Sequence, residues 1–240
     1  MTHTDDWRPV WERKGAQVQD GALDLSELLR ANGYDTGHGD LTVDAWTSYT
    51  QTVLDLLGAE SGQSLYEIGC ERARFACPSN QAGLAVAGSD YSSTLVVAAS
   101  KALADGEFEC CEASKVPAFP QYDFVVASGV FIYFPDLEYA GTVIRAMVAK
   151  ARRGIAILDN PDLAHKEETL ALRYHVAGGK QEYEKRYQGL DHLYFDRNWF
   201  ARQLESAGAT SVLIRDQEIQ DHGNAAGRFN VFARLRQTCP

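Results

Sequence analysis

The chain has 240 residues with a formal net charge of −10, and 45% of its residues are hydrophobic. This length and composition predict a globular protein with its own core, and the acidic excess argues against a nucleic-acid partner. No apolar run reaches the roughly 20 residues that span a bilayer, and the polar N-terminus lacks the apolar part of a secretion signal, so we expect no membrane association.

Short apolar runs alternate with helical patterns from about residue 65 onward. The runs that we expect to form strands are 64–69, 84–90, 107–113, 122–129 and 153–160. Helical patterns follow the second and fourth of these runs, at 92–103 and 136–151. Strands that are apolar throughout and separated by helices predict a parallel sheet with helices on both faces.

The pattern changes toward the C-terminus. A helix is expected at 196–208, and two apolar runs follow at 211–219 and 229–236. The polar link between these runs is too short for a helical crossover, so the runs predict an antiparallel pair.

We therefore expect an α/β fold with a doubly wound, Rossmann-like sheet that is mostly parallel and has an antiparallel C-terminal strand. Residues 61–240 would form this domain, with an insertion at about 161–195, and residues 1–60 would form a helical N-terminal cap. The cap and the insertion are both candidate lids over the open edge of the sheet.

Three segments carry a resemblance to a known family: EIG at 67–69, GSDYS at 88–92 and YDFVVASGVFIYFPDL at 122–137. With these segments and this order of elements, the chain from about residue 45 onward resembles class I S-adenosylmethionine (AdoMet)-dependent methyltransferases. It is most similar to the small tailoring enzymes of microbial natural-product pathways. The resemblance implies a ligand site beyond the carboxyl ends of the strands, where strand order switches direction.

The resemblance also implies roles for four residues around the cofactor. Glu67 and Gly69 would begin the loop after the first strand, Asp90 would accept hydrogen bonds from the ribose hydroxyls, and Glu112 would lie beside the adenine. A second interpretation of Asp90 stays open, because this residue directly precedes the helix expected at 92–103 and can cap it.

The loop after the first expected strand, CERARFA at 70–76, departs from the family pattern. Glu71 and Ala73 stand where the family has glycines, which permit positive φ and let a ligand approach the backbone. Glu71 also brings a negative charge to the place of the AdoMet carboxylate, and Pro78 would interrupt the next helix. We therefore expect AdoMet binding to be impaired, with no bound cofactor.

Arg72 and Arg74 indicate another use of this loop. Near a helix N-terminus, two guanidinium groups can hold a sulfate, a phosphate or a carboxylate. The alternative is that both arginines lie at the surface and form ion pairs with Glu67 or Glu71.

Several polar residues lie where the family binds its substrate. The candidates for catalysis are Tyr133, Asp159, Asp191 and His192, and the candidates for substrate binding are Asn160 and Tyr194. Asp159 would act as a general base or orient an amine, and His192 beside Asp191 is a candidate proton acceptor. The alternatives are a turn residue at Asp159 and a surface histidine without a role. The segment HGNAAGRFN at 222–230 is interpreted as a turn.

The five cysteines form no CxxC pair and no zinc spacing, and the chain has no nucleophile elbow, P-loop or HExxH motif. We therefore expect no metal site. An odd number of thiols without a signal peptide is typical of a reduced, cytoplasmic protein.

Three functions remain open. The first is a methyltransferase-fold protein of antibiotic or other natural-product biosynthesis that no longer methylates, and instead catalyses a displacement or ring closure with loss of an anionic leaving group. The second is an active AdoMet-dependent methyltransferase with an atypical loop. The third is a non-catalytic protein that binds a partner subunit or a carrier protein. For the two enzymes, the expected substrate is a small molecule, either free or bound to a carrier protein.

Overall fold

The computed structural model describes residues 4–16, 24–31, 41–220, 222–223 and 225–236. Its centre is a seven-stranded sheet in the order β3-β2-β1-β4-β5-β7-β6. The strands are β1 (Ser64–Ile68), β2 (Ala85–Asp90), β3 (Glu107–Cys110), β4 (Tyr122–Ser128), β5 (Ala151–Pro161), β6 (Ala209–Asp216) and β7 (Arg228–Leu235). The first five strands pair with one another in parallel, and β7 is antiparallel to both β5 and β6, as predicted.

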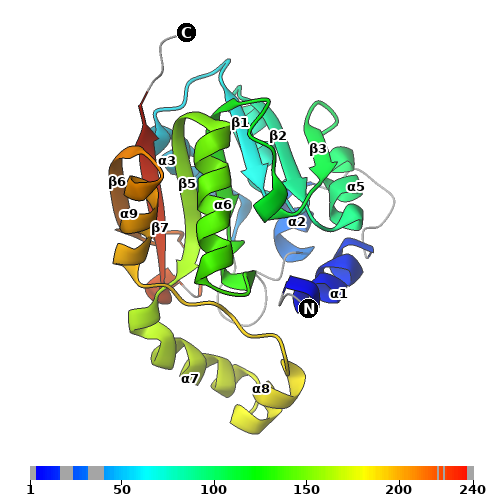
Figure 1. The fold of residues 1–240 in the computed structure, drawn as a ribbon. Helices are drawn as coiled ribbons and strands as arrows, with labels where there is room; N and C mark the ends of the chain where they lie inside the picture. Colours follow the sequence, from blue (N-terminus) through cyan, green and yellow to red (C-terminus); the bar gives the residue numbers. More distant parts are fainter. Residues whose placement is uncertain (1–3, 17–23, 32–40, 221, 224, 237–240) are drawn as a thin grey trace.

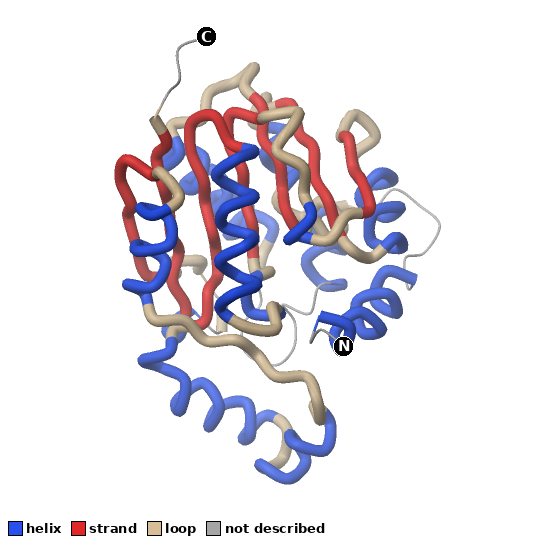
Figure 2. Tube along the Cα trace, in the orientation of Figure 1, coloured by secondary structure: helices blue, strands red, loops and turns tan. Residues whose placement is uncertain are grey.

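Nine α-helices are present among the described residues, and they cover both faces of the sheet (Figures 1 and 2). They are α1 (Thr4–Ala16), α2 (Leu25–Ala31), α3 (Val43–Leu57), α4 (Ala76–Gln81), α5 (Ser93–Ala102), α6 (Leu137–Lys150), α7 (Lys166–Val176), α8 (Lys180–Arg186) and α9 (Arg197–Ser206). In Figure 1, α1, α7 and α8 lie beyond the carboxyl ends of the parallel strands. No described helix is long and apolar enough to cross a membrane.

The alternation of side chains along each strand divides the core between the two faces of the sheet. On β4, Val125 and Ala127 pack in the cluster that contains the buried residues of α6, while Phe124 and Val126 pack in the cluster that contains those of α3. Since successive strand residues point to opposite faces, a strand buried on both sides must be apolar throughout. This requirement explains why the apolar runs predicted the strands correctly.

The structure corrects three local expectations. β3 ends at Cys110, and a short 3-10 helix over Ala113–Lys115 takes the place of the rest of the predicted strand. β5 begins at Ala151, earlier than the expected start at residue 153. Pro78 interrupts no helix, because α4 begins only at Ala76 and the proline lies in its first turn, where the missing N–H has no helical partner.

The two segments predicted to act as lids are placed differently. α3 packs onto the sheet with Trp46 and Val53 fully buried, so this part of the N-terminal segment belongs to the core, whereas α1 lies at the ligand end. The insertion carries α7 and α8. It leaves and re-enters the domain at one place, where Asp162 and Phe195 form a parallel bridge and Arg197 donates to the Asp162 carboxylate at 2.7 Å.

Gly69 ends β1 and is required there on two grounds. Its φ is +69°, and a Cβ at this position would lie 2.4 Å from Cγ2 of Val130. Gly62 has a φ of +86°, but nothing lies within 4 Å of its Cβ position, so it provides a matched control.

We expect Gly62→Ala to lower the free energy of unfolding by about 1 kcal/mol, and Gly69→Ala by about 3 kcal/mol because the methyl group also overpacks Val130. Urea unfolding of the two variants measures the difference. Equal losses would show that the contact with Val130 relaxes without cost.

Candidate ligand site

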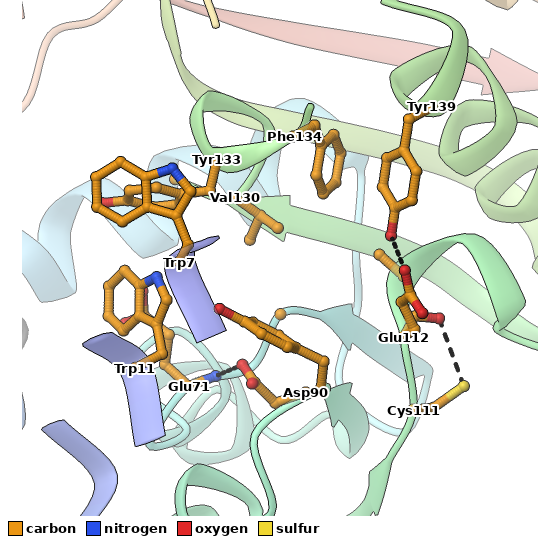
Figure 3. A pocket seen from close by; sticks show the side chains of 14 residues that line it. Trp7, Trp11, Glu71, Asp90, Cys111, Glu112, Val130, Tyr133, Phe134 and Tyr139 are labelled. Atoms are coloured by element: carbon orange, nitrogen blue, oxygen red, sulfur yellow. Dashed lines mark hydrogen bonds between the residues drawn. The ribbon is translucent and has the colours of Figure 1, made fainter. Parts of the chain in front are cut away.

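Two connected cavities lie at the carboxyl ends of the strands. We call the first the slot, whose lining includes Gly69, Glu71, Asp90, Glu112 and Val130 (Figure 3). The second, the chamber, is lined by residues of α1, α7, α8 and the ends of β5 and β7. The space free of protein atoms is about 600 Å³ in the slot and about 1770 Å³ in the chamber, open solvent at each mouth included, so the chamber is the larger of the two.

The loop after β1 follows the path of a glycine-rich loop although two of its residues carry side chains. Gly69, Glu71 and Ala73 have φ values of +69°, +48° and +63°. The N–H of Glu71 donates to Oδ2 of Asp90 at 3.1 Å, and the N–H groups of Gly69 and Cys70 both donate to the carbonyl of Ser89. Surrounding contacts of this kind maintain a backbone conformation that L residues adopt only at a cost.

The carboxylate of Glu71 lies at the junction of the slot and the chamber and lines both. It forms an ion pair with Nε of Arg74 at 3.5 Å. The negative charge expected at this position is therefore present but neutralised by a neighbour. The ion pair removes the objection to ligand binding that came from the charge of Glu71. The objection that came from its bulk stays, because a side chain still stands where the family has glycine.

Arg72 and Arg74 do not form the anion site that the sequence suggested. Both are buried, and neither lines the slot or the chamber. Arg72 donates to the carbonyl of Lys14, and Arg74 lies 4.3 Å over the ring of Trp46 and donates to the carbonyl of Ser128. The two guanidinium groups attach the loop to α1 and α3 and do not face a ligand.

Asp90 lines the slot and is buried. Its second oxygen accepts from the N–H of Ser92 at 2.9 Å, and it is the hydroxyl of Ser92 that caps α5. The alternative interpretation of Asp90 as the helix cap is therefore wrong. Burial, together with the nearby carboxylate of Glu71, raises the pKa of Asp90 to about 7.

Glu112 lies at the opposite end of the slot from α1, where it accepts a hydrogen bond from the hydroxyl of Tyr139 at 3.1 Å (Figure 3). The slot thus has hydrogen-bond acceptors at both of the places where the resemblance puts ribose and adenine. Glu67 does not reach the slot. It is buried behind the loop, and burial raises its pKa well above the ordinary value.

Two tryptophans of α1 form the wall shared by the slot and the chamber. Trp7 and Trp11 contact the ring of Tyr133, with centroid separations of 4.8 and 5.1 Å. Burial raises the pKa of Tyr133 to about 12, so its hydroxyl stays protonated at neutral pH and can only donate or accept a hydrogen bond.

Asp159 lines the chamber with a φ of +60° and has several partners. Its carboxylate contacts Nε2 of His222 at 3.2 Å and Nη1 of Arg228 at 3.5 Å, and it accepts from Gln217 at 3.3 Å. Burial raises its pKa, but Arg228 and His222 outweigh burial and hold the pKa below the ordinary value. This ionised, fully engaged carboxylate suits orientation of His222 better than proton abstraction.

His192 also lines the chamber, and its Nδ1 bonds to the guanidinium of Arg173. A guanidinium group only donates, so Nδ1 accepts and the neutral ring carries its proton on Nε2. Burial, with the charges of Arg173 and Arg228, lowers the pKa of His192 well below its ordinary value. The geometry therefore makes His192 a hydrogen-bond donor and disfavours the predicted role as proton acceptor.

The other candidates stand apart from the chamber. The side chain of Asp191 is exposed, and only its carbonyl takes part, accepting from Nε1 of Trp7. Tyr194 lies under Lys166, and the side-chain amide of Asn160 donates to two carbonyls between β5 and β7. None of the three lines either cavity.

Comparison with known proteins relates part of the chain to a family. Residues 66–152 match a family described as the methyltransferase domain. No curated protein sequence matches the chain.

Two solved structures share the fold of this chain. Magnesium protoporphyrin IX methyltransferase (ChlM) of Synechocystis PCC 6803, with bound AdoMet, gives a TM-score of 0.61 at 16% identity and covers 98% of both chains. The N-methyltransferase NodS of Bradyrhizobium japonicum WM9, in complex with S-adenosylhomocysteine, gives 0.59 at 13% identity and covers 97% of this chain and 98% of its own.

The segment that matches the family, residues 66–152, contains Glu71, Asp90 and Glu112 of the slot. The chamber residues Arg173, His192 and His222 lie outside it. Arg173 and His222 were not among the sequence candidates. The segment 222–230, interpreted as a turn, supplies both His222 and Arg228. A weak signal was present, since His222 lies in the link between β6 and β7, and this link is at the carboxyl end of β5.

Ala73 tests the strain in the loop. We expect Ala73→Gly to raise the free energy of unfolding by about 1 kcal/mol, because glycine adopts its positive φ without a steric cost. Ala98, equally buried inside α5, is the control: Ala98→Gly should lower stability by about 1 kcal/mol. Urea unfolding measures both, and a loss of stability in Ala73→Gly would contradict the strain.

Asp159 predicts a pH dependence. Because its pKa is lower in the folded state, its stabilisation is present above the ordinary aspartate pKa of about 4 and is lost as the pH falls below that value. Asp159→Asn, which tolerates the same φ, should make the free energy of unfolding less dependent on pH below about 4. The matched control is Asp105→Asn at a solvent-exposed turn. If the free energy of unfolding changed with pH in the same way in both variants below about 4, this role of Asp159 would be refuted.

Proposed function

We propose that the protein transfers the methyl group of AdoMet to a small molecule held in the chamber. The observation that carries this proposal is the loop 69–73, which keeps the positive-φ path of a glycine-rich AdoMet loop although glycine is absent at two positions. A strained path persists only where the rest of the structure maintains it. Such maintenance is unexpected in a loop that has no ligand to accommodate.

The charges of the slot support a cationic ligand. Its lining includes the carboxyl groups of Glu71, Asp90 and Glu112, and no Lys or Arg among the described residues. AdoMet, when bound, supplies an electrophilic methyl group on a positively charged sulfur. Asp90 and Glu112 would accept hydrogen bonds from its adenosine half, and Glu71, at the junction, would face the ammonium group of its methionine half.

The chamber offers a route for a proton that a nucleophile must lose. His222 lies in the chamber wall, and the ionised carboxylate of Asp159 contacts its Nε2 at 3.2 Å. A carboxylate in this position orients the imidazole. His222 would therefore take the proton, and Asp159 would act as its positioning residue.

A second function is favoured by one observation. The Glu71 side chain and the two tryptophans of α1 occupy the end of the slot where the methionine half of AdoMet would lie. If they exclude it, the chamber would support a displacement or ring closure without AdoMet, with an anionic leaving group stabilised by its cationic residues. A role in natural-product biosynthesis, a carrier-bound substrate, a partner subunit and a cytoplasmic location remain predictions of the sequence.

Calorimetric titration with AdoMet and with S-adenosylhomocysteine tests the proposal. We expect dissociation constants of about 10–100 μM, and an affinity about 10-fold weaker in Glu112→Gln, which loses a charged acceptor, about 1.4 kcal/mol. Glu138→Gln, on the exposed side of α6, is the matched control and should bind as the wild type does.

Two other outcomes separate the candidate functions. No heat with either ligand, in a folded protein, would overturn the methyltransferase proposal and favour displacement. Binding that appears only in Glu71→Gly would show that the Glu71 side chain blocks the slot.

A further inference from the structure

The chamber differs from the rest of the molecule in its charge. The chain is strongly acidic, yet the cationic residues of the chamber wall outnumber its acidic ones, Glu71 and Asp159. Both acids are engaged, Glu71 by Arg74 and Asp159 by Arg228 and His222. Positive charge therefore remains at the wall, on the side formed by α7 and α8.

Arg173 of α7 provides part of this charge. It forms no ion pair in the described part of the chain, and its Nη1 contacts only the Tyr183 hydroxyl, at 3.5 Å, and Nδ1 of His192. Nε and Nη2 have no acceptor within the described protein. A guanidinium group with these donors unused in a cavity matches the planar oxygens of a carboxylate or the oxygens of a phosphate.

His192 adds a donor next to this guanidinium. Because Nδ1 accepts from Arg173, the hydrogen lies on Nε2, which has no partner among the described residues. The ring is held between Trp7, at a centroid distance of 5.0 Å, and Tyr133, at 5.7 Å. The chamber thus contains an oriented, uncharged N–H donor beside a fixed cation.

The two lid helices keep their acidic residues out of the chamber wall. The glutamates of α7 and α8 all lie outside the chamber wall, namely Glu167, Glu168, Glu182 and Glu184. Arg173 and Arg186 lie in the wall, with Leu172, Val176 and Tyr187 beside them. The lid therefore presents cations and apolar surface together, which suits an anion that carries an apolar or aromatic body.

We infer that the chamber binds a small-molecule oxyanion, a carboxylate or a phosphate ester with an apolar body, through Arg173 and the Nε2–H of His192. This inference rests on the proposed function in that it names the acceptor class for the same site. It places the anion at the lid and leaves His222 and Asp159, at the sheet, for the reacting end of the molecule.

Three probes of similar shape test the inference: benzoate, phenyl phosphate and the neutral benzamide. Their binding is followed by quenching of tryptophan fluorescence, since Trp7 lies against His192. We expect at least one anion to bind at about millimolar concentration and about 10-fold more tightly than benzamide. A preference for benzoate or for phenyl phosphate distinguishes a carboxylate from a phosphate ligand.

Arg173→Met should weaken binding of the preferred anion about 10-fold, and Arg173→Lys should restore part of it. Arg202→Met, on the exposed face of α9, removes the same charge outside the chamber and should leave binding unchanged. Circular dichroism confirms that each variant is folded. Equal binding of benzamide and both anions, no binding of any probe, or full binding in Arg173→Met would overturn the inference.

These titrations contain no AdoMet, so they fail or succeed independently of the slot. Anion binding without AdoMet binding would leave the inference standing and remove the proposed methyl transfer. AdoMet binding with no anion binding would do the reverse.

Discussion

The hydrogen bond from the N–H of Glu71 to the carboxylate of Asp90 connects the ends of β1 and β2, and the ligand site depends on it. It helps to hold a loop in which Glu71 and Ala73 adopt left-handed conformations. Arg72 and Arg74, buried behind the loop, attach it to α1 and to the core. Local preference and tertiary constraint disagree here, and the tertiary constraint prevails.

The two cavities that meet at this loop have opposite electrostatic character. Carboxyl groups line the slot. Guanidinium groups that form no ion pair among the described residues line the lid side of the chamber. Two ligands of opposite charge would each be attracted to one cavity and repelled by the other, which fixes their order along the site. Glu71 and Tyr133 lie in both walls and form the boundary between them.

The sequence predicted the sheet well because a parallel strand covered on both faces, such as β4, must be apolar throughout. Three of the residues that the sequence singled out, Gly69, Asp90 and Glu112, line the slot, because they lie at or just after the ends of strands. The expectation failed for Arg72 and Arg74, since adjacency in a loop does not reveal which side chains turn inward. Tyr133, Asp159 and His192 were also candidates and line the chamber, whereas Arg173 and His222 come from separate segments that no local pattern connects to them.

The insertion begins and ends at the bridge between Asp162 and Phe195, and Arg197 closes that junction with Asp162. Since the anchor points are already adjacent in the domain, the entropy of closing the insertion depends only weakly on its length, by about 0.6 kcal/mol for each doubling. The lid is in this sense a module. Its length and composition, and with them the ligand that the chamber accepts, can change while the sheet and the slot stay as they are.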